Sequence, residues 1–311
     1  MKDYNGMCKN CMKLGADCAG CTNEVYSGCI YKVEGKKEDT NMMKSQFAQA
    51  VAQKVNGEVR EVEKANGVKF TAILVNTGNA TIRPCVYIDE FYEDEWSVNE
   101  TAEKVRDLAE SSAMPSRIEF MSADVFEDWE RVKPMLRARL YNERTSADVK
   151  RPAGYGLDDL VIIPYIDIYG ITGSDVNRSI KVTNELLKIW KVTADDVIDA
   201  AEANSADDVV IDSLVDTIAA MTGMPVDDAM REDSPLVVTN RSKTYGAYAV
   251  IAGYEALKER FPDGFTVLPS SIHEVLVVSA YDDRFNDMVN EVNDTVVDDV
   301  DVLGSKAYRV A

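Results

Sequence analysis

The chain has 311 residues, of which 54 are acidic and 34 are Lys or Arg, so its formal net charge is −20 at neutral pH. Such a surface repels phosphate backbones and anionic membranes, which disfavours nucleic-acid and membrane binding and favours a basic protein partner. No apolar run approaches the roughly 18 residues of a membrane-spanning helix, and the start lacks the apolar stretch of a secretory signal. We therefore expect a cytoplasmic protein with one large or two ordinary domains.

Clustered cysteines set the first 37 residues apart from the rest of the chain. In a reducing compartment such thiols are metal ligands more often than disulfides, and zinc takes four thiolates in a tetrahedron. The spacing matches neither ferredoxin pattern of an iron–sulfur cluster. A segment this short and poor in apolar residues needs a bound ion to fold, so we predict structural Zn²⁺ in a module over 1–37. Two sets of ligands are open: Cys8, Cys11, Cys18 and Cys21, or the same set with Cys29 in place of Cys21.

Residues 38–150 are predicted to form an α+β unit. Apolar residues recur at helical spacing over 47–55, and Gly57 ends that helix. The pair Asn66-Gly67 between two β-rich runs predicts a hairpin, because a type I′ turn needs positive φ at both central positions. A third strand over 81–88 contains a proline, which restricts it to an edge.

Two helices are predicted in the rest of this unit. Ser97 and Glu100 have the spacing of a capping box, which starts a helix. A second helical pattern runs over about 123–140 and is broken or kinked at Pro134. The polar stretch that follows, 143–156, contains the predicted boundary between the two units.

Residues 151–311 are predicted to form a second α+β unit, which makes the chain an α+β protein overall. A small zinc-knuckle-like module thus precedes two units, each with a short, mostly antiparallel sheet packed by helices. The strands are expected at 159–170, 179–183, 236–240, 265–278 (two strands) and 306–310. The helices are expected at 184–192, from Thr193 onward, 246–261 and 285–292.

The single histidine, His273, limits the chemistry that the chain can perform. If its segment is a strand, Ser271 and His273 share one face and Glu274 points to the other, which makes these three the candidate catalytic residues. No Gly-x-Ser-x-Gly elbow, Walker loop or Gly-x-Gly-x-x-Gly occurs. The arrangement is more typical of a structural histidine.

The loop over 239–246 is the candidate ligand-binding segment. It follows a predicted strand and precedes a predicted buried helix, the junction at which α/β proteins often contact ligands. The candidate ligand-binding residues are Asn240, Lys243 and Tyr245.

Several stretches resemble an uncharacterised family of gut clostridia, often found beside mobile elements and known only as a domain of unknown function. The resemblance covers residues 42–311 and brings no known activity. The amino-terminal module resembles a cysteine motif of the same bacteria that ends in "GCIY", here Gly28 to Tyr31. That motif implies Cys8, Cys11, Cys18 and Cys29 as the metal ligands and leaves Cys21 as the spare. The family resemblance rests on "VYIDEFYED", "FEDWERVKPMLRARLYN", "VTNELLKIWKVTADDVIDAA", "LVVTNRSKTYGAYAVI" and "FTVLPSSIHEVLVV".

Two interpretations of function follow. The first is a non-catalytic interaction or regulatory protein. The residues after the first 37 have a net charge of −22, against +2 in the first 37, and they contain no recognisable catalytic constellation. The alternative is an enzyme, a hydrolase or a nucleotide-processing protein, whose site combines the 239–246 loop with the Ser270–Glu274 turn. That alternative requires the two segments to converge on one pocket.

Overall fold

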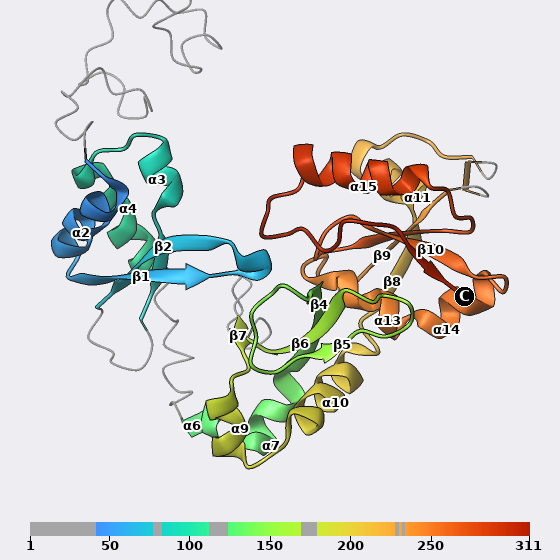
Figure 1. Cartoon of the computed structure of the whole chain (residues 1–311), viewed down its shortest axis with the longest axis horizontal. Coiled ribbons are helices and arrows are strands. Elements are labelled where there is room, and N and C mark those ends of the chain that lie inside the picture. The colour runs from blue at the N-terminus through green and yellow to red at the C-terminus, as the bar shows by residue number, and fades with distance from the viewer. Residues whose placement is uncertain (1–41, 77–82, 112–123, 169–178, 228–229, 232–233) are drawn as a thin grey trace, which may run out of the picture.

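The computed structural model describes residues 42–76, 83–111, 124–168, 179–227, 230–231 and 234–311. Within these residues the chain forms three antiparallel sheets with helices packed against them (Figure 1). The mixed architecture with short antiparallel sheets is therefore confirmed. The predicted cysteine-rich module over 1–37 lies outside the described residues.

The first sheet is a meander in the order β1-β2-β3, covered by helices on one side (Figure 1). Its strands are β1 (Gly57–Glu63), β2 (Lys69–Val75) and β3 (Cys85–Tyr87). Its helices are α2 (Lys44–Lys54), α3 (Asp89–Glu93) and α4 (Val98–Ser111). The predicted capping box starts α4, because the Ser97 hydroxyl accepts from the Glu100 N–H while the Glu100 carboxylate accepts from the Ser97 N–H.

The hairpin between β1 and β2 forms where the Asn-Gly pair predicts it. Asn66 and Gly67 have φ of 60° and 74°, as left-handed turn residues do. The last ladder pair is Glu63 with Lys69, so the connection is longer than a two-residue turn. The Asn66 amide donates to the carbonyl oxygens of Asp299 and Val302, which ties the hairpin tip to the carboxyl-terminal part of the chain.

Residues 136–142 depart from the prediction, because they form a strand and not the end of a helix. The helical pattern stops with α6 (Asp124–Glu127) and α7 (Trp129–Val132), and Pro134 lies in a 3₁₀ turn. The strand β4 (Leu136–Asn142) follows and pairs along its whole length with β6 (Leu160–Asp167). Both strands are buried on both faces, and such strands lack the alternation that separates strand from helix in a sequence.

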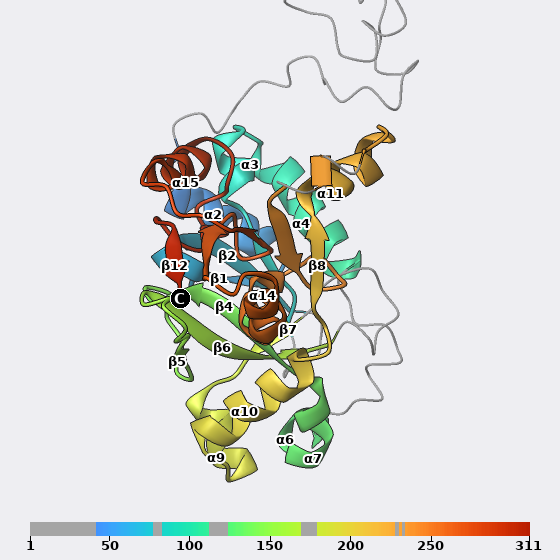
Figure 2. The same cartoon turned by 90° about the vertical axis from the view of Figure 1, so that its right-hand side faces the viewer.

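The second sheet has β6 at its centre. The short strands β5 (Arg151–Pro152) and β7 (Ser179–Lys181) also pair with β6, and β7 lies where a strand was expected. Two capped helices follow in the chain, α9 (Asn184–Trp190) and α10 (Ala194–Ser205). Figures 1 and 2 show α6, α7, α9 and α10 gathered at one end of the molecule, beneath this sheet.

The third sheet has five strands in the order β12-β10-β11-β9-β8. One side carries α13 and α14, and the other side carries α11 and α15 (Figures 1 and 2). The strands are β8 (Val210–Ser213), β9 (Leu236–Thr239), β10 (Phe265–Pro269), β11 (Val275–Val278) and β12 (Tyr308–Val310). The helices are α11 (Leu214–Thr222), the 3₁₀ turn η4 (Gly246–Tyr248), α13 (Ala249–Ala252), α14 (Tyr254–Arg260) and α15 (Arg284–Thr295).

The buried side chains form two separate cores. One lies under the first sheet and runs in sequence from Phe47 to Ala109, and the other is shared by the second and third sheets and runs from Val132 to Val310. Residue 150, at which the sequence analysis divides the chain, lies within the second range. None of the helices in the described segments has the length and apolar character that crossing a membrane requires.

Candidate functional site

A cavity of about 400 Å³ opens where the second and third sheets meet. Its walls come from β4, the end of α10, the loop after β9 and the turn η4, so residues far apart in the sequence share it. The side chains of Arg139 in β4 and Tyr245 in the loop both line it.

Arg139 is the unusual residue of this cavity, because its side chain carries a charge and yet only 5% of the residue is exposed. Its guanidinium carbon lies 4.3 Å from the ring centroid of Tyr165 and 3.8 Å from that of Tyr245. Within the described residues the two rings do not contact each other, so the guanidinium lies between them. A cation over an aromatic ring gains up to about 2 kcal/mol when it is desolvated.

Contacts with the two rings do not use the N–H groups of the guanidinium as hydrogen-bond donors. Among the residues that the structure describes, none forms a hydrogen bond or an ion pair with the side chain of Arg139. A buried charge without such a partner is costly, and buried charges in proteins are normally paired. The cavity is therefore where an anionic partner for Arg139 would sit.

Two more arginines increase the positive charge of the cavity wall. Arg137 and Arg241 both line the cavity, together with the carboxylates of Asp167 and Asp208. Arg241 is held in place, since its N–H donates to Asp208 at 3.1 Å and its guanidinium donates to the Asp207 carbonyl oxygen at 2.7 Å. Three guanidinium groups against two carboxylates make this a locally cationic hollow on a protein whose net charge is −20.

The loop that carries Tyr245 is ordered by its own polar side chains. The Asn240 side-chain oxygen accepts from the N–H of Thr244 and from the Ser242 hydroxyl, and its amide donates to the Thr244 carbonyl oxygen. Lys243 and Tyr245 both have positive φ, 52° and 53°, which bulky residues adopt rarely. This backbone shape directs Tyr245 onto Arg139.

The turn between β10 and β11 forms hydrogen bonds with the same loop. The Tyr245 N–H donates to Nδ1 of His273 at 3.0 Å, and the Gly246 N–H donates to the His273 carbonyl oxygen at 3.0 Å. The Thr239 hydroxyl donates to that same oxygen. A Cβ on Gly246 would lie 2.6 Å from the Asn240 nitrogen and 2.8 Å from the His273 oxygen, so only glycine fits this approach.

His273 is occupied on both ring nitrogens. Because Nδ1 accepts from Tyr245, the ring proton is on Nε2, which faces an Asp301 carboxylate oxygen at 3.4 Å. The Ser271 hydroxyl accepts from the His273 backbone N–H and not from the ring. This segment is a turn and not a strand, closed by the Ser271 N–H on the Glu274 carbonyl oxygen. The expected pairing of Ser271 and His273 on one strand face therefore does not occur.

Only some of the predicted site residues line the cavity. Asn240 and Tyr245 line the cavity, Lys243 is exposed and does not, and the 270–274 turn lies behind the loop. The cysteine ligands Cys8, Cys11, Cys18, Cys21 and Cys29 lie outside the described residues. Within those residues, no group of three or more His, Cys, Asp or Glu is arranged to hold a metal ion.

Sequence reasoning missed Arg139 and Tyr165. It assigned residue 139 to the end of a helix, where an arginine is expected on the solvent side. No local pattern marks them, because Arg139 lies opposite Ile163, and Arg137 opposite Tyr165, only once β4 pairs with β6. Arginine is almost never fully buried unless it is paired, so this burial marks the cavity as a candidate site.

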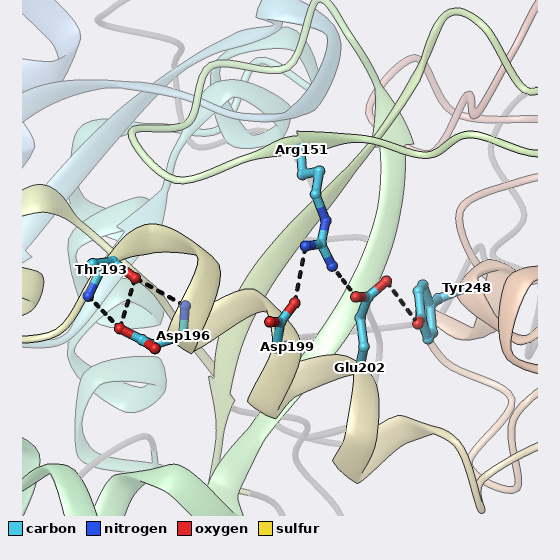
Figure 3. Close-up of polar contacts among 6 residues, drawn as sticks. All are labelled: Arg151, Thr193, Asp196, Asp199, Glu202 and Tyr248. Carbon is cyan, nitrogen blue, oxygen red and sulfur yellow. Dashed lines mark hydrogen bonds and ion pairs between the residues drawn. The ribbon is translucent and has the colours of Figure 1, made fainter.

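A polar network supports the cavity from the side of α10 (Figure 3). Tyr248 lines the cavity, and its hydroxyl donates to the Glu202 carboxylate at 3.1 Å. Arg151 of β5 pairs with Glu202 and with Asp199, both on α10. Burial, and then the negative charge of Glu202, raise the pKa of Tyr248 well above its usual value, so this tyrosine stays neutral.

These observations define an α+β protein with a cationic, guanidinium-lined cavity between two antiparallel sheets. The chain belongs to a family of unknown function, DUF5688, whose model matches residues 37–310. Comparisons with curated proteins and with solved structures find no match. The predicted membership of a family of unknown function is thus confirmed, and the bacterial source and the four-cysteine motif stay predictions.

Proposed function

We propose that this protein is a non-catalytic regulatory protein that binds a small oxyanion, a phosphate or carboxylate group of a metabolite, in the Arg139 cavity. The observation that carries the proposal is the Arg139 guanidinium, buried between two tyrosine rings and without a protein partner among the described residues.

The chemistry of arginine supports this assignment. A guanidinium is planar, so aromatic rings can stack on both of its faces while its in-plane N–H groups still reach a ligand. Phosphate and carboxylate groups match that fork of donors with two parallel hydrogen bonds. A lysine could not be held in this way, because an ammonium has no flat face.

Binding is favoured over the alternative of an enzyme, because the 270–274 turn contacts the 239–246 loop but does not line the cavity. The contacts of His273 explain the preference: its Nδ1 accepts from Tyr245, and its Nε2 faces Asp301. A general base needs a ring nitrogen free to take a proton from substrate. In this proposal His273 therefore has a structural role, which is to hold the loop in place through its hydrogen bond with Tyr245.

The proposal includes the amino-terminal module. Cys8, Cys11, Cys18 and Cys29 hold a structural Zn²⁺, with Cys21 as the alternative ligand, and the protein works in the reducing cytoplasm. The motive is the spacing of the thiols in a segment that cannot fold by burial alone.

Isothermal titration with three anionic probes and one neutral probe tests the proposed function. The anions are inorganic phosphate, a nucleoside 5′-monophosphate and succinate, and the neutral probe is ribose. We expect the wild type to bind at least one anion, and Arg139→Met to lose about 10- to 100-fold in affinity, the worth of a hydrogen-bonded charge. Arg139→Lys should recover little of it.

The control is Arg309→Met, which removes an exposed arginine of the third sheet that does not line the cavity. It has the same change in net charge and should bind like the wild type. Failure of all three anions to bind, or equal binding by Arg139→Met, would show that the cavity is not an oxyanion site.

A further inference from the structure

The outer side of the five-stranded sheet is only partly covered. Val275 and Val277 of β11 belong to the shared core, so by strand alternation Leu276 and Val278 face the opposite side, where both are half-buried. Figures 1 and 2 show α11 and α15 on that opposite side, with α15 towards β12 and α11 towards β8. We call this side the outer face.

The helix α11 is apolar along most of its length, yet it buries none of its residues. Its exposed side chains include Ile218 and Met221, the latter 81% exposed. The apolar character continues beyond the helix with Met224 and Met230, which are also exposed. A helix of this composition is normally packed against a partner.

The helix α15 presents a second set of exposed apolar side chains on the outer face. It buries only Val289, while Met288 and Val292 are exposed and Val296, just after the helix, is 77% exposed. Single exposed apolar residues are ordinary, but two helices that both expose several of them on one side of a sheet are typical of an interaction surface. This Met-Val surface has two parts: Ile218, Met221, Met224 and Met230 in and after α11, and Met288, Val292 and Val296 in and after α15.

Carboxylates dominate the charge of the two segments that carry the Met-Val surface. The two arginines in these segments are both ion-paired, Arg231 with Asp216 at 2.8 Å and Arg284 with Asp282 at 2.6 Å. The remaining charges of the described residues here are therefore negative, and no base opposes them in the α15 segment. The exposed carboxylates are those of Asp212, Asp227, Asp283, Asp287, Glu291, Asp294, Asp298 and Asp299.

The charge selects the occupant of this surface. A second copy of the chain would bring the same carboxylates against these, and an anionic membrane would be repelled. A helix with an apolar stripe flanked by Lys and Arg complements both the methionines and the carboxylates. Methionine side chains suit such a role, because they are flexible and adapt to irregular apolar partners.

We propose that the Met-Val surface docks a basic amphipathic helix of a partner protein. This docking site is on the outer face of the third sheet and is separate from the Arg139 cavity, which lies between the second and third sheets. The two proposals can therefore fail independently of each other.

Fluorescence anisotropy with designed helical peptides tests the docking site on the full chain. The probe has leucines at helical spacing and lysines elsewhere. One control has the same composition in scrambled order, which presents no apolar stripe, and another has glutamate in place of lysine. We expect binding of the probe alone, weakened as salt rises from about 0.05 to about 0.5 M.

Variants of exposed residues locate the site without threatening the fold. The double variant Met221→Ser/Val296→Ser should lower the affinity for the probe peptide by about tenfold or more. Met43→Ser, 63% exposed but just before α2 of the first unit, is the matched control and should stay within about twofold. Arg139→Met should also leave the peptide affinity unchanged, because it alters only the cavity.

Three results would overturn the docking proposal. The first is an absence of probe binding, and the second is equal binding of the scrambled peptide, which would show attraction between net charges alone. The third is equal binding by the double variant. Sedimentation equilibrium adds a further check: a dimer that the double variant abolishes would assign the surface to a second copy of the chain and overturn the proposal.

Discussion

Arg139 of β4 and Tyr245 of the loop after β9 stack on each other, with 3.8 Å between the guanidinium carbon and the ring centroid. The position of Tyr245 depends on His273, which accepts its backbone N–H. The second and third sheets are thus joined at the cavity by a chain of contacts that runs from Arg139 through Tyr245 to His273. A ligand on Arg139 would strengthen this joint, since it would pair the one buried charge in it.

Replacing His273 by Ala should lower the free energy of unfolding by about 1–3 kcal/mol, because the Tyr245 N–H loses its acceptor. His273→Asn retains an acceptor near the Nδ1 position and should recover most of that loss. Urea denaturation measures both variants, and titration with phosphate shows whether the loop still places Tyr245. Wild-type stability in His273→Ala would contradict the role of this residue as a brace.

Gly246→Ala should cost about 3 kcal/mol, because the new Cβ would overlap backbone atoms of Asn240 and His273. Gly154→Ala is the matched control: its Cβ would meet nothing within 4 Å, and only its positive φ of 73° is unfavourable. That strain is worth about 1 kcal/mol. Chemical denaturation of both variants measures the difference, and equal losses would show that the close approach at Gly246 relaxes.

Glu202→Ala should destabilise the protein by about 1–3 kcal/mol, because it leaves the Tyr248 hydroxyl without its acceptor and removes one partner of Arg151. Asp199→Ala removes the other partner of the same arginine. The Asp199 side chain is 67% exposed, so its loss should cost at most about 1 kcal/mol. Thermal unfolding of the two variants compares them directly, and similar losses would contradict the importance of the Tyr248 contact.

The capping box of α10 should make the stability of the protein depend on pH, because one of its members, Asp196, can be protonated. Hydrogen bonds from the Thr193 hydroxyl and then the Thr193 N–H lower the pKa of Asp196 (Figure 3). A lowered pKa in the folded state stabilises the protein fully above the unfolded value of about 3.9. That contribution is lost as the pH falls through the lower, folded value.

Asp196→Asn should therefore unfold at a lower temperature than the wild type at neutral pH, with the difference shrinking below pH about 4. Thermal unfolding between pH 3 and 7 measures the gap between the two proteins. A gap that stays constant with pH would show that the asparagine fails for a reason other than charge.

Elemental analysis should find one Zn²⁺ per chain, because four thiolates at this spacing complete a tetrahedron. Cys29→Ser should lose the metal, and Cys21→Ser should keep it. The reverse pattern would assign Cys21 to the ligand set in place of Cys29. Cys85→Ser is the control, since this exposed free thiol belongs to β3 and not to the cysteine-rich module.

Much of the local structure was predictable, because its causes are local. Thr193 and Asp196 cap α10, Ser97 and Glu100 cap α4, and Asn66-Gly67 turns the first hairpin, in each case through contacts among residues a few positions apart. The candidate loop was also found in part, since Asn240 and Tyr245 line the cavity. A strand–loop–helix junction can be read from a short window of sequence.

The sequence alone determined the acidic charge, the clustered thiols, the capped helices and the turns, because composition and near neighbours decide these. Only the tertiary structure decided that residues 136–142 are a strand and that Arg139 is buried between Tyr165 and Tyr245. The physical reason is that burial of a charge depends on what other segments bring to it. Pairing of β4 with β6 and the turn that holds Tyr245 supply those partners from distant parts of the chain.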